Sequence, residues 1–502
     1  MPYLIGIDLG TSSLKAMIVD EAGKTMAVAS RDYTIESPAA GCAEQNPQIW
    51  WDACVYACKK AIAQSGVEAS NIKGVGFSGQ MHGMVSLDEN YEVVRPAILH
   101  CDARSSEQVR RIRETLGEDR IPALTGNPIY TGFLLPSLLW VRDNEPENYR
   151  RIRHVCLPKD YIRYRLCGVL ASDYSDASAT LAFDLESNGW SRRILDAFSL
   201  PADIFPACLD SFAPVGKVIA AKETGLCAGT VVVAGGGDQV MQGVGNGAIG
   251  FDTATVNIGS SGQVSFQSAK PLVHPALCTN TFVGYEKGRW IVMGAIMQAG
   301  LALKWVKNLL GSQSYAELDT MAARARPGSG GVLFLPYLNG ERTPHINPAL
   351  SGAFFGCNMQ TGKAEMIRAV MEGVAFALMQ CMEVCGDVGL CASEVIASGG
   401  GAKSALWLQI QSDIYGLPLK VAESAEQACL GAAIVAGVGC GVYRDVAQGC
   451  AAAVRYQDRV IQPNGKNHEI YMAYYQLFKD GYQAAGDVLT RATRLGRAVQ
   501  ND

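Results

Sequence analysis

Two short turns in the chain combine glycine with hydroxyl side chains directly after an apolar run. The first, residues 10–13, reads Gly-Thr-Ser-Ser and follows Asp8, and the second, residues 259–262, reads Gly-Ser-Ser-Gly. Glycine lets backbone N–H groups converge without a Cβ in the way, and hydroxyls add donors, so such turns suit a nucleotide phosphate. Asp8 could hold water around Mg²⁺, which prefers carboxylates, waters and phosphate oxygens. The alternative is that both segments are merely good turn formers.

The two turns occupy matching positions in the two halves of the chain. Each lies between strand-like runs, and they are about 250 residues apart. That spacing indicates a duplicated domain rather than a solenoid, whose period would be far shorter. Two matching hairpins favour a phosphate clamp over two unrelated turns.

A third segment runs from the apolar residues Val231–Ala234 into three glycines, Asp238 and Gln239. We therefore expect Asp238 at the carboxyl end of a buried strand, where open α/β sheets bind ligands. A carboxylate there suits a general base that takes a proton from a substrate hydroxyl as the hydroxyl attacks phosphorus. The alternative is that Asp238 caps the following helix.

Two further segments could form walls of a binding site. Residues Gly399–Ser404 stand between a strand pattern and a helix pattern, an order typical of nucleotide sites, although a tight turn would look the same. The segment Gln80–Val85 follows the strand pattern Ile72–Ser78 and offers a polar pocket wall. His82 has no Ser or Cys partner nearby in sequence, so we expect it to donate a hydrogen bond to substrate rather than to shuttle protons. In the next loop, Asp102 and Arg104 could line the same cleft or form only a surface ion pair.

The elements that must position these residues form an α/β pattern. A helix is predicted from Pro47, with Asn46 as its N-cap. The strands predicted around it are Tyr3–Asp8, Leu14–Asp20, Thr25–Ser30 and Ile72–Ser78. Three strands, a helix and another strand describe an α/β domain with a mixed sheet.

Composition excludes several classes of protein. The chain has 502 residues, 48% of them hydrophobic, and a formal net charge of −5, so neither nucleic acid nor an anionic membrane is expected as a partner. No charge-free apolar run reaches the roughly 18 residues of a membrane-spanning helix, and the N-terminus lacks a basic signal region, so we expect a cytoplasmic protein. The 16 cysteines include no Cys-x-x-Cys and are expected to be reduced core residues.

Together these segments resemble the FGGY carbohydrate kinases of the actin-like ATPase superfamily. The resemblance covers about residues 3–445 and rests on Asp8–Ser13, Ala234–Gln239, Gly259–Gly262, Tyr337–Pro344 and Gly399–Ser404. It implies an α/β fold of two actin-like (ribonuclease H-like) ATPase domains with a cleft between them. We expect an N-terminal domain over 1–247, a C-terminal domain over 252–445 and a helical tail over 446–502.

Within this family, three segments are similar to the xylulokinases, namely Gln80–Gly83, Leu157–Tyr161 and Ser172–Ser178. The chain departs from the xylulokinase pattern at three places: His100-Cys101 for Trp-Asn, Ser137 for Lys, and Ser260 for Thr. These departures touch the sugar cleft more than the nucleotide site.

The resemblance implies ATP-dependent phosphorylation of D-xylulose to D-xylulose 5-phosphate by in-line transfer. Asp238 would be the general base, and Asp8 would act on Mg²⁺ through water. The sugar would be bound by Met81, His82, Asp238 and Gln239. ATP would be bound by Thr11, Ser12, Ser13, Lys15, Gly259, Ser260, Gly300, Gly400, Gly401 and Ser404. The segment Tyr337–Pro344 is interpreted as architectural.

Two other interpretations stay open. The first is an FGGY kinase for D-ribulose, L-ribulose, gluconate, a deoxyketose or another polyol, which the wall Gln80–Met84 with His100–Arg104 would distinguish. The second is a non-catalytic, actin-like ATP-binding sensor, which would have no need of Asp238 beside a sugar wall. Dimers are common among such enzymes, but no interface can be read from the sequence.

Overall fold

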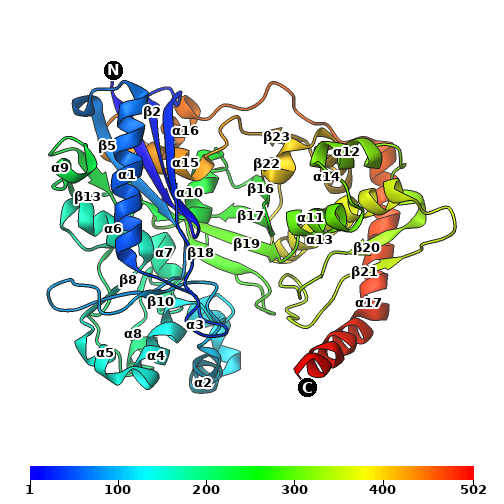
Figure 1. The fold of residues 1–502 in the computed structure, drawn as a ribbon, viewed down its shortest axis with the longest axis horizontal. Helices are drawn as coiled ribbons and strands as arrows, with labels where there is room; N and C mark the ends of the chain where they lie inside the picture. Colours follow the sequence, from blue (N-terminus) through cyan, green and yellow to red (C-terminus); the bar gives the residue numbers. More distant parts are fainter. Residues whose placement is uncertain (502) are drawn as a thin grey trace.

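The computed structural model describes residues 1–501, which form two lobes, each built on a mixed β-sheet (Figure 1). The final residue of the predicted tail, Asp502, lies outside the described residues. In the first lobe the sheet has the order β13-β14-β5-β1-β2-β3, and β15 also pairs with β5. Its strands are β1 (Tyr3–Leu9), β2 (Ser13–Asp20), β3 (Thr25–Asp32), β5 (Ile72–Gly79), β13 (Pro214–Lys217), β14 (Val231–Val233) and β15 (Gly236–Gly237).

The second sheet repeats the first. Its order is β18-β19-β17-β16-β22-β23. In both sheets a central strand pairs antiparallel with the strand after the glycine turn and parallel with a strand far along the chain. The strands are β16 (Thr253–Ile258), β17 (Gly262–Ser268), β18 (Asn280–Val283), β19 (Trp290–Ile296), β22 (Glu394–Gly399) and β23 (Leu419–Val421). The predicted two-domain α/β architecture with mixed sheets is confirmed.

Helix α1 (Pro47–Ser65) covers one face of the first sheet and begins where the sequence predicts. The Asn46 side chain accepts a hydrogen bond from the Gln48 N–H at 3.0 Å, and Gly66 ends the helix in the left-handed conformation. Ile5 and Ile7 of β1 pack in the same core cluster as the buried face of α1. Because side chains alternate along a strand, Gly6 faces the opposite side of the sheet.

That opposite side is covered by helix α15 (Gln427–Gly439), which lies very close to the sheet. A Cβ on Gly6 would lie 1.8 Å from the Cys429 carbonyl oxygen, and one on Gly76 would lie 1.9 Å from that of Ala432. Helix α16 (Val446–Ala453) packs on α15, and both are seen beside the strands of the first lobe in Figure 1. Along the chain, α15 falls in the predicted C-terminal domain and α16 in the predicted tail. In space, both helices belong to the first lobe.

The first lobe carries a second layer with its own hydrophobic core, below the sheet in Figure 1. Its helices are α2 (Ser106–Leu116), α3 (Ile121–Thr125), α4 (Leu134–Asn144), α5 (Pro146–Arg151) and α8 (Arg192–Ala197). The other helices of this lobe lie outside that layer: α6 (Pro158–Cys167) and α9 (Ala221–Thr224) pack on α1, α10 (Asp238–Gly245) packs on α15, and α7 (Tyr174–Ser178) packs on β18. Short strand pairs join these helices, formed by β4 (Glu44–Gln45), β6 (Val85–Leu87), β7 (Ala97–Ile98), β8 (His154–Cys156), β9 (Ser172–Asp173), β10 (Phe183–Asp184), β11 (Gly189–Trp190) and β12 (Cys208–Leu209).

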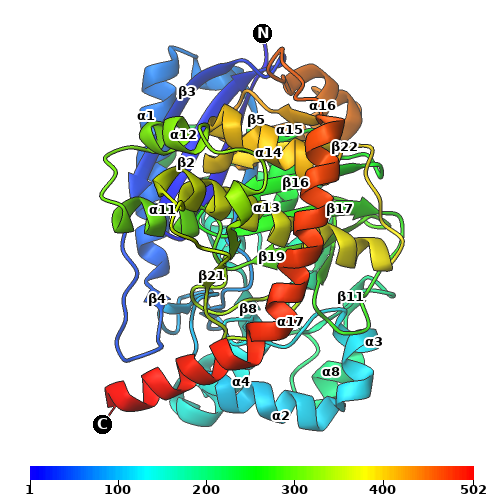
Figure 2. The same cartoon turned by 90° about the vertical axis from the view of Figure 1, so that its right-hand side faces the viewer.

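Helix α13 (Lys363–Asp387) packs on β17 and β19 at the centre of the second lobe. Within the described residues it is the one helix long and apolar enough to cross a membrane, but 78% of its most apolar stretch is buried in the protein, as in a core helix. Around it lie α11 (Gly300–Leu309), α12 (Tyr315–Ala322), α14 (Ala405–Tyr415), β20 (Leu333–Leu335) and β21 (Ala353–Phe355). The long α17 (Gly465–Asn501) runs down the outside of this lobe (Figure 2).

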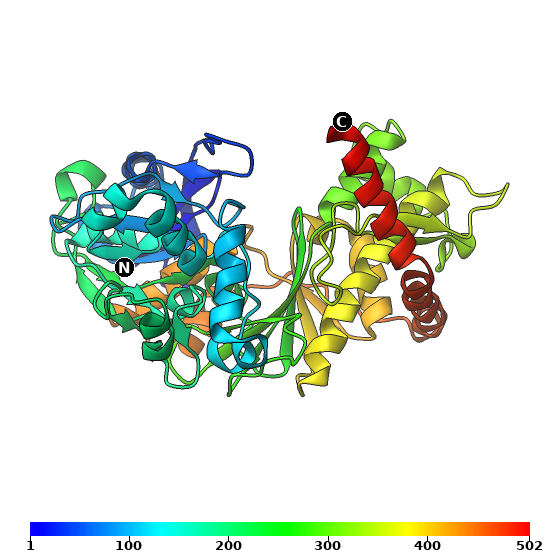
Figure 3. The ribbon, with the colours of Figure 1, turned by 90° about the horizontal axis from the view of Figure 1, so that it is seen from below.

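Viewed from below, the two lobes lie side by side, and the strands of the second lobe's sheet lie on the side of that lobe nearer the first lobe (Figure 3). All 16 cysteines are unpaired. Cys54, Cys58, Cys381 and Cys385 are buried on α1 and α13, as predicted for core cysteines. Four others are exposed, so the prediction of a core position is wrong for Cys101, Cys227, Cys357 and Cys391.

Candidate active site

A cavity of about 390 Å³ is lined by residues of both lobes. The first lobe contributes the ends of β1, β5 and β15, and the second contributes the hairpin between β16 and β17 and the end of β19. Its wall includes Thr11, Gln80, Met81, His82, His100, Tyr130, Asp238 and Gln239 from the first lobe, with Ser261, Gln263, Asn280, Met297 and Arg342 from the second. All four predicted sugar-site residues therefore meet in one cavity.

Strand pairing brings the two predicted catalytic carboxylates to the same edge of the sheet. Asp8 is the register partner of Ser78, and Gly236 pairs with Ser78 from the other side, so Asp238 follows two residues later. The Ser78 hydroxyl donates to an oxygen of Asp8 at 2.7 Å. Removal from water raises the pKa of Asp8, and it raises the pKa of Asp238 to about 7, with the charge of Asp8 as a second cause. A carboxylate poised near neutrality can accept a proton under physiological conditions.

Asp238 does not cap the helix that follows it. Gly237 occupies the N-cap position of α10, and Asp238 is the first helical residue. Gly237 has no room for a side chain, because a Cβ there would lie 2.8 to 3.0 Å from three atoms of Met81. Met81 therefore packs against the backbone that carries Asp238.

His82 stands on the cavity wall in a strained backbone conformation, with φ of 72°. Its Nδ1 lies 2.8 Å from the Ala179 carbonyl oxygen, and its ring lies against Phe133 with centroids 4.0 Å apart. Burial lowers the pKa of His82 to about 3, so the ring carries a single proton. A carbonyl only accepts, so that proton is on Nδ1 and Nε2 is an acceptor. This tautomer contradicts the expectation that His82 donates to substrate, because Nε2 can only accept a hydrogen bond.

A second cavity, of about 500 Å³, lies within the second lobe. Six predicted nucleotide residues line it: Gly259, Ser260, Gly300, Gly400, Gly401 and Ser404. The Ser404 hydroxyl also caps α14 by accepting from the Trp407 N–H at 3.0 Å. Sequence reasoning missed Lys304, Tyr315 and Asp319, which line the same cavity from α11 and α12. No turn motif marks these helices, so the sequence carried no signal for them.

Only one of the predicted phosphate-binding residues of the first hairpin lines a cavity. Thr11 lines the cavity between the lobes, whereas Ser12, Ser13 and Lys15 line neither cavity in the described chain. The Lys15 ammonium instead pairs with the Glu426 carboxylate at 2.6 Å. In this structure Lys15 therefore contacts the N-terminus of α15. The phosphate-binding role of Ser12, Ser13 and Lys15 remains a prediction.

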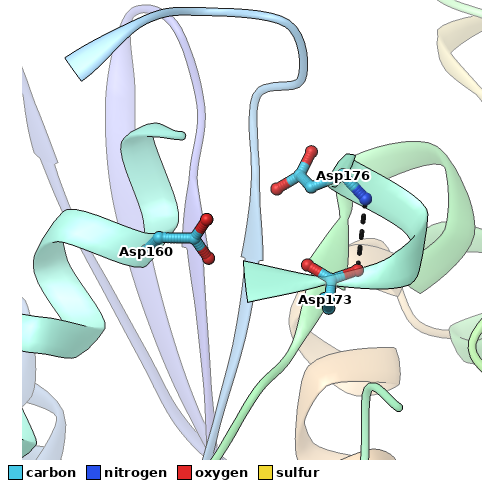
Figure 4. A group of neighbouring side chains, drawn as sticks. All are labelled: Asp160, Asp173 and Asp176. Atoms are coloured by element: carbon cyan, nitrogen blue, oxygen red, sulfur yellow. Dashed lines mark hydrogen bonds between the residues drawn. The ribbon is translucent and has the colours of Figure 1, made fainter. Parts of the chain in front are cut away.

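A fully buried ion cluster lies behind the edge of the sheet. The Lys159 ammonium lies 2.7 Å from Asp160, 2.5 Å from Asp173 and 3.0 Å from Asp176. Figure 4 shows the three carboxylates turned toward one another from α6 (Asp160), β9 (Asp173) and α7 (Asp176). Burial raises the pKa of Asp176 well above its ordinary value, which leaves Asp160 and Asp173 opposite the charges of Lys159 and Arg163. The cluster is thus a salt-bridge network around an ammonium rather than a metal centre.

This ion cluster is connected by hydrogen bonds to the edge of the first sheet that carries Asp8 and Asp238. The Gly237 N–H donates to the Ser175 hydroxyl at 2.9 Å, and that hydroxyl donates to Asp173. The buried charges therefore fix the backbone immediately before Asp238. The sequence pointed to Lys159 and Asp173 only through their likeness to the xylulokinases.

Two other predicted cleft residues lie elsewhere. The Asp102 and Arg104 side chains form a buried ion pair at 2.8 Å, and Arg104 also binds Glu44 at 2.6 Å, so this pair ties loops together and does not line the cavity. Of the residues that depart from the xylulokinase pattern, His100 reaches this cavity, whereas Cys101 and the buried Ser137 do not line it.

Family models match nearly the whole chain. The N-terminal domain model of the FGGY family of carbohydrate kinases matches residues 3–245, and the C-terminal domain model of that family matches residues 254–440. The chain belongs to the FGGY family of carbohydrate kinases. It is accordingly an ATP-dependent carbohydrate kinase, and ATP is its co-substrate.

Individual relatives of this FGGY kinase cover most of its length. A xylulose kinase from Staphylococcus epidermidis is 37% identical over 97% of this chain and 98% of the relative. A gluconokinase from Bacillus subtilis is 32% identical over 86% of each. Among solved structures, a xyloylose kinase from Brucella ovis has a TM-score of 0.91, 32% identity, and covers 97% of this chain and 100% of its own. The relatives within this family are thus named for different substrates, xylulose and gluconate.

Proposed function

We propose that this FGGY kinase phosphorylates D-xylulose to D-xylulose 5-phosphate. The observation that carries the proposal is Asp238, a carboxylate with a pKa near 7 in a cavity lined by both lobes, beside His82 and Met81. The choice of D-xylulose is supported by the full-length relatives named xylulose kinase. The gluconokinase relative makes D-gluconate the first competing substrate.

The proposed reaction is an in-line phosphoryl transfer. Asp238 takes the proton of the terminal hydroxyl, O5, as that oxygen bonds to the γ-phosphorus of ATP. The bond between the γ-phosphorus and the bridging oxygen breaks, the electron pair leaves with ADP, and Asp238 ends protonated. Met81 and His82 hold the sugar, with His82 Nε2 accepting from a hydroxyl, and Gln239 adds an amide beside the base.

Asp8 fits the role proposed for it toward Mg²⁺. Its carboxylate is half-buried, beside Asp238, and keeps one oxygen free of the Ser78 hydrogen bond. Mg²⁺ retains several waters and binds one or two carboxylates, so Asp8 would hold it through water. When bound, the ion neutralises negative charge on the phosphates.

The cavity in the second lobe is proposed to hold the nucleoside end of ATP. Its glycines, Gly300, Gly400 and Gly401, offer bare backbone on which a flat base can lie, and Gly259 and Ser260 face the phosphates. Thr11, Ser12, Ser13 and Lys15 would complete the phosphate site from the first lobe. For Lys15 this requires exchange of Glu426 for a phosphate oxygen.

ADP release from the purified protein with MgATP tests the proposal. The panel comprises D-xylulose, D-ribulose, L-ribulose, D-gluconate, glycerol and no sugar. We expect the highest kcat/KM for D-xylulose. Preference for another sugar would overturn the substrate and keep the phosphoryl-transfer site. Bound ATP with no turnover of any sugar would favour the sensor interpretation.

A further inference from the structure

Arg342 lies on the cavity wall contributed by the second lobe, in a segment whose backbone is fixed on both sides. One oxygen of the buried Glu341 carboxylate accepts from the Arg342 N–H at 2.7 Å and from the Met297 N–H at 2.8 Å. The Thr343 hydroxyl accepts from the Ala295 N–H at 3.1 Å and donates to the Cys278 carbonyl at 2.6 Å. These bonds hold the Arg342 backbone against the end of β19.

The Arg342 side chain, by contrast, has no acidic partner. In the described part of the chain, no carboxylate lies within ion-pair distance of its guanidinium, and the residue is exposed to the cavity. An arginine that only stabilised the lobe would be expected to use its five donors within it. Here the backbone of Arg342 makes the supporting hydrogen bonds, and the N–H donors of its guanidinium face the cavity.

The guanidinium lies on the wall of the same cavity as His82 and His100 and is close enough for its charge to act on both rings. After burial, its positive charge contributes to lowering the pKa of both rings. The charge that acts on Asp238 comes instead from Asp8. The cavity is therefore polarised, with two carboxylates where the hydroxyl is phosphorylated and a guanidinium toward the histidines.

We propose that Arg342 is a specificity-determining residue that donates hydrogen bonds to the acceptor oxygen at the end of the substrate remote from the phosphorylated hydroxyl. A planar guanidinium suits an oxygen that only accepts, such as the C2 carbonyl of a ketose or the carboxylate of an aldonate. The inference rests on the proposed function, in which D-xylulose presents O5 to Asp238 and its carbonyl to Arg342. A polyol that has a hydroxyl in place of the carbonyl makes a weaker partner.

The test compares wild type, Arg342→Met and Arg342→Lys on D-xylulose and on its C2-reduced polyol, D-arabinitol. Arg324→Met, which removes an exposed arginine of the same lobe outside the cavity, is the matched control. In Arg342→Met we expect KM for D-xylulose to rise at least ~10-fold with kcat within about threefold. The preference for D-xylulose over D-arabinitol should fall at least ~10-fold, with Arg342→Lys in between and Arg324→Met unchanged.

Binding of D-xylulose by calorimetry and the melting temperature provide readouts independent of turnover. We expect weaker binding in Arg342→Met at an unchanged melting temperature. An unchanged KM, or equal losses on both sugars, would overturn the role of Arg342. If wild type prefers D-gluconate, the proposed substrate fails, but the same rise in KM, measured on D-gluconate, still tests Arg342. A wild-type protein that turns over no sugar overturns both proposals.

Discussion

At the scale of single residues, the proposed mechanism depends on how Asp238 is kept from water. The residue has a carboxylate neighbour in Asp8 and no cationic side chain among the causes that act on its pKa. Both its surroundings and Asp8 favour the protonated form, so the base becomes available only near neutral pH. A general base with a pKa near the working pH combines the correct ionisation state with useful proton affinity.

This predicts the acid limb of the pH–rate profile. The neutral carboxylic acid cannot take a proton, so kcat/KM for the sugar should rise with pH up to about 7 and level off above it. Below that pH the rate should fall about tenfold per pH unit. Initial rates from pH 5 to 9 at saturating MgATP give the profile. A limb near pH 4 would show that Asp238 titrates as an ordinary aspartate.

Sequence reasoning placed Asp238 in the right position because its signal is local: a strand pattern, three glycines and a carboxylate within eight residues. It placed His82 on the cavity wall but not its tautomer, because the deciding partner, Ala179, is 97 residues away in the chain. Asp102 and Arg104 showed the same limit. The second partner of Arg104, Glu44, lies in β4 about 60 residues earlier, so an ion pair and a cleft wall could not be told apart from sequence.

At the scale of elements, the sheet edge that carries Asp8 and Asp238 depends on close contact between the first sheet and α15. The carbonyl oxygens of α15 lie where the Cβ atoms of Gly6 and Gly76 would be. The edge is also held from behind, where Lys159 and Asp173 act on Gly237 through the Ser175 hydroxyl. Both supports fix backbone within a few residues of Asp8 and Asp238.

Gly76→Ala tests the first support. The new methyl would lie 1.9 Å from a backbone oxygen, so either the helix or the strand must move, at a cost of about 1–3 kcal/mol or more. Thermal unfolding should show a clearly lower melting temperature than wild type. Gly386→Ala is the control, since its Cβ would meet no atom within 4 Å and its site lies in α13. Equal melting temperatures for the two variants would contradict the close packing.

The elements that carry the hairpins were predictable, and their partners were not. Strand β1 begins at Tyr3 and helix α1 at Pro47, as predicted from periodicity and capping residues. The position of α15 on the first sheet was not visible, because the Gly/Ala-rich sequence 427–439 shows that a helix is tightly packed but not against what. Contacts between elements 350 residues apart leave no mark within either one.

At the scale of the whole molecule, the site is divided between the lobes. The cavity proposed for the sugar draws its wall from both lobes, whereas the cavity proposed for the nucleotide belongs to the second lobe alone. Ser12, Ser13 and Lys15 of the first lobe reach neither cavity. For these residues to act on phosphate, the lobes must approach each other, and such closure would also exclude water that hydrolyses ATP.

Closure predicts a change in shape that small-angle scattering can measure. With D-xylulose and a non-hydrolysable ATP analogue together, the radius of gyration should fall by ~1 Å from the roughly 23 Å expected for a compact chain of this length. Glycerol with the same analogue is the control and should give a smaller change. An unchanged radius with both ligands bound would contradict closure.

The duplicated architecture was predictable at this scale, because two matching turns head the two halves of the sequence. The division of the site was predictable only through the family resemblance. The relative placement of the lobes depends on many weak contacts, among them the Asn127 and Asn280 side chains joined across the lobes at 3.0 Å. Neither asparagine stands out in the sequence.

The central claim is that Asp238 performs the chemistry in a sugar cavity that it does not itself hold together. The decisive measurement is kcat of Asp238→Asn on D-xylulose, alongside calorimetric binding of the sugar. We predict that kcat falls at least ~10²-fold while the dissociation constant of D-xylulose changes less than about threefold, because the amide keeps the shape and cannot take the proton. Turnover near the wild-type rate would contradict the account.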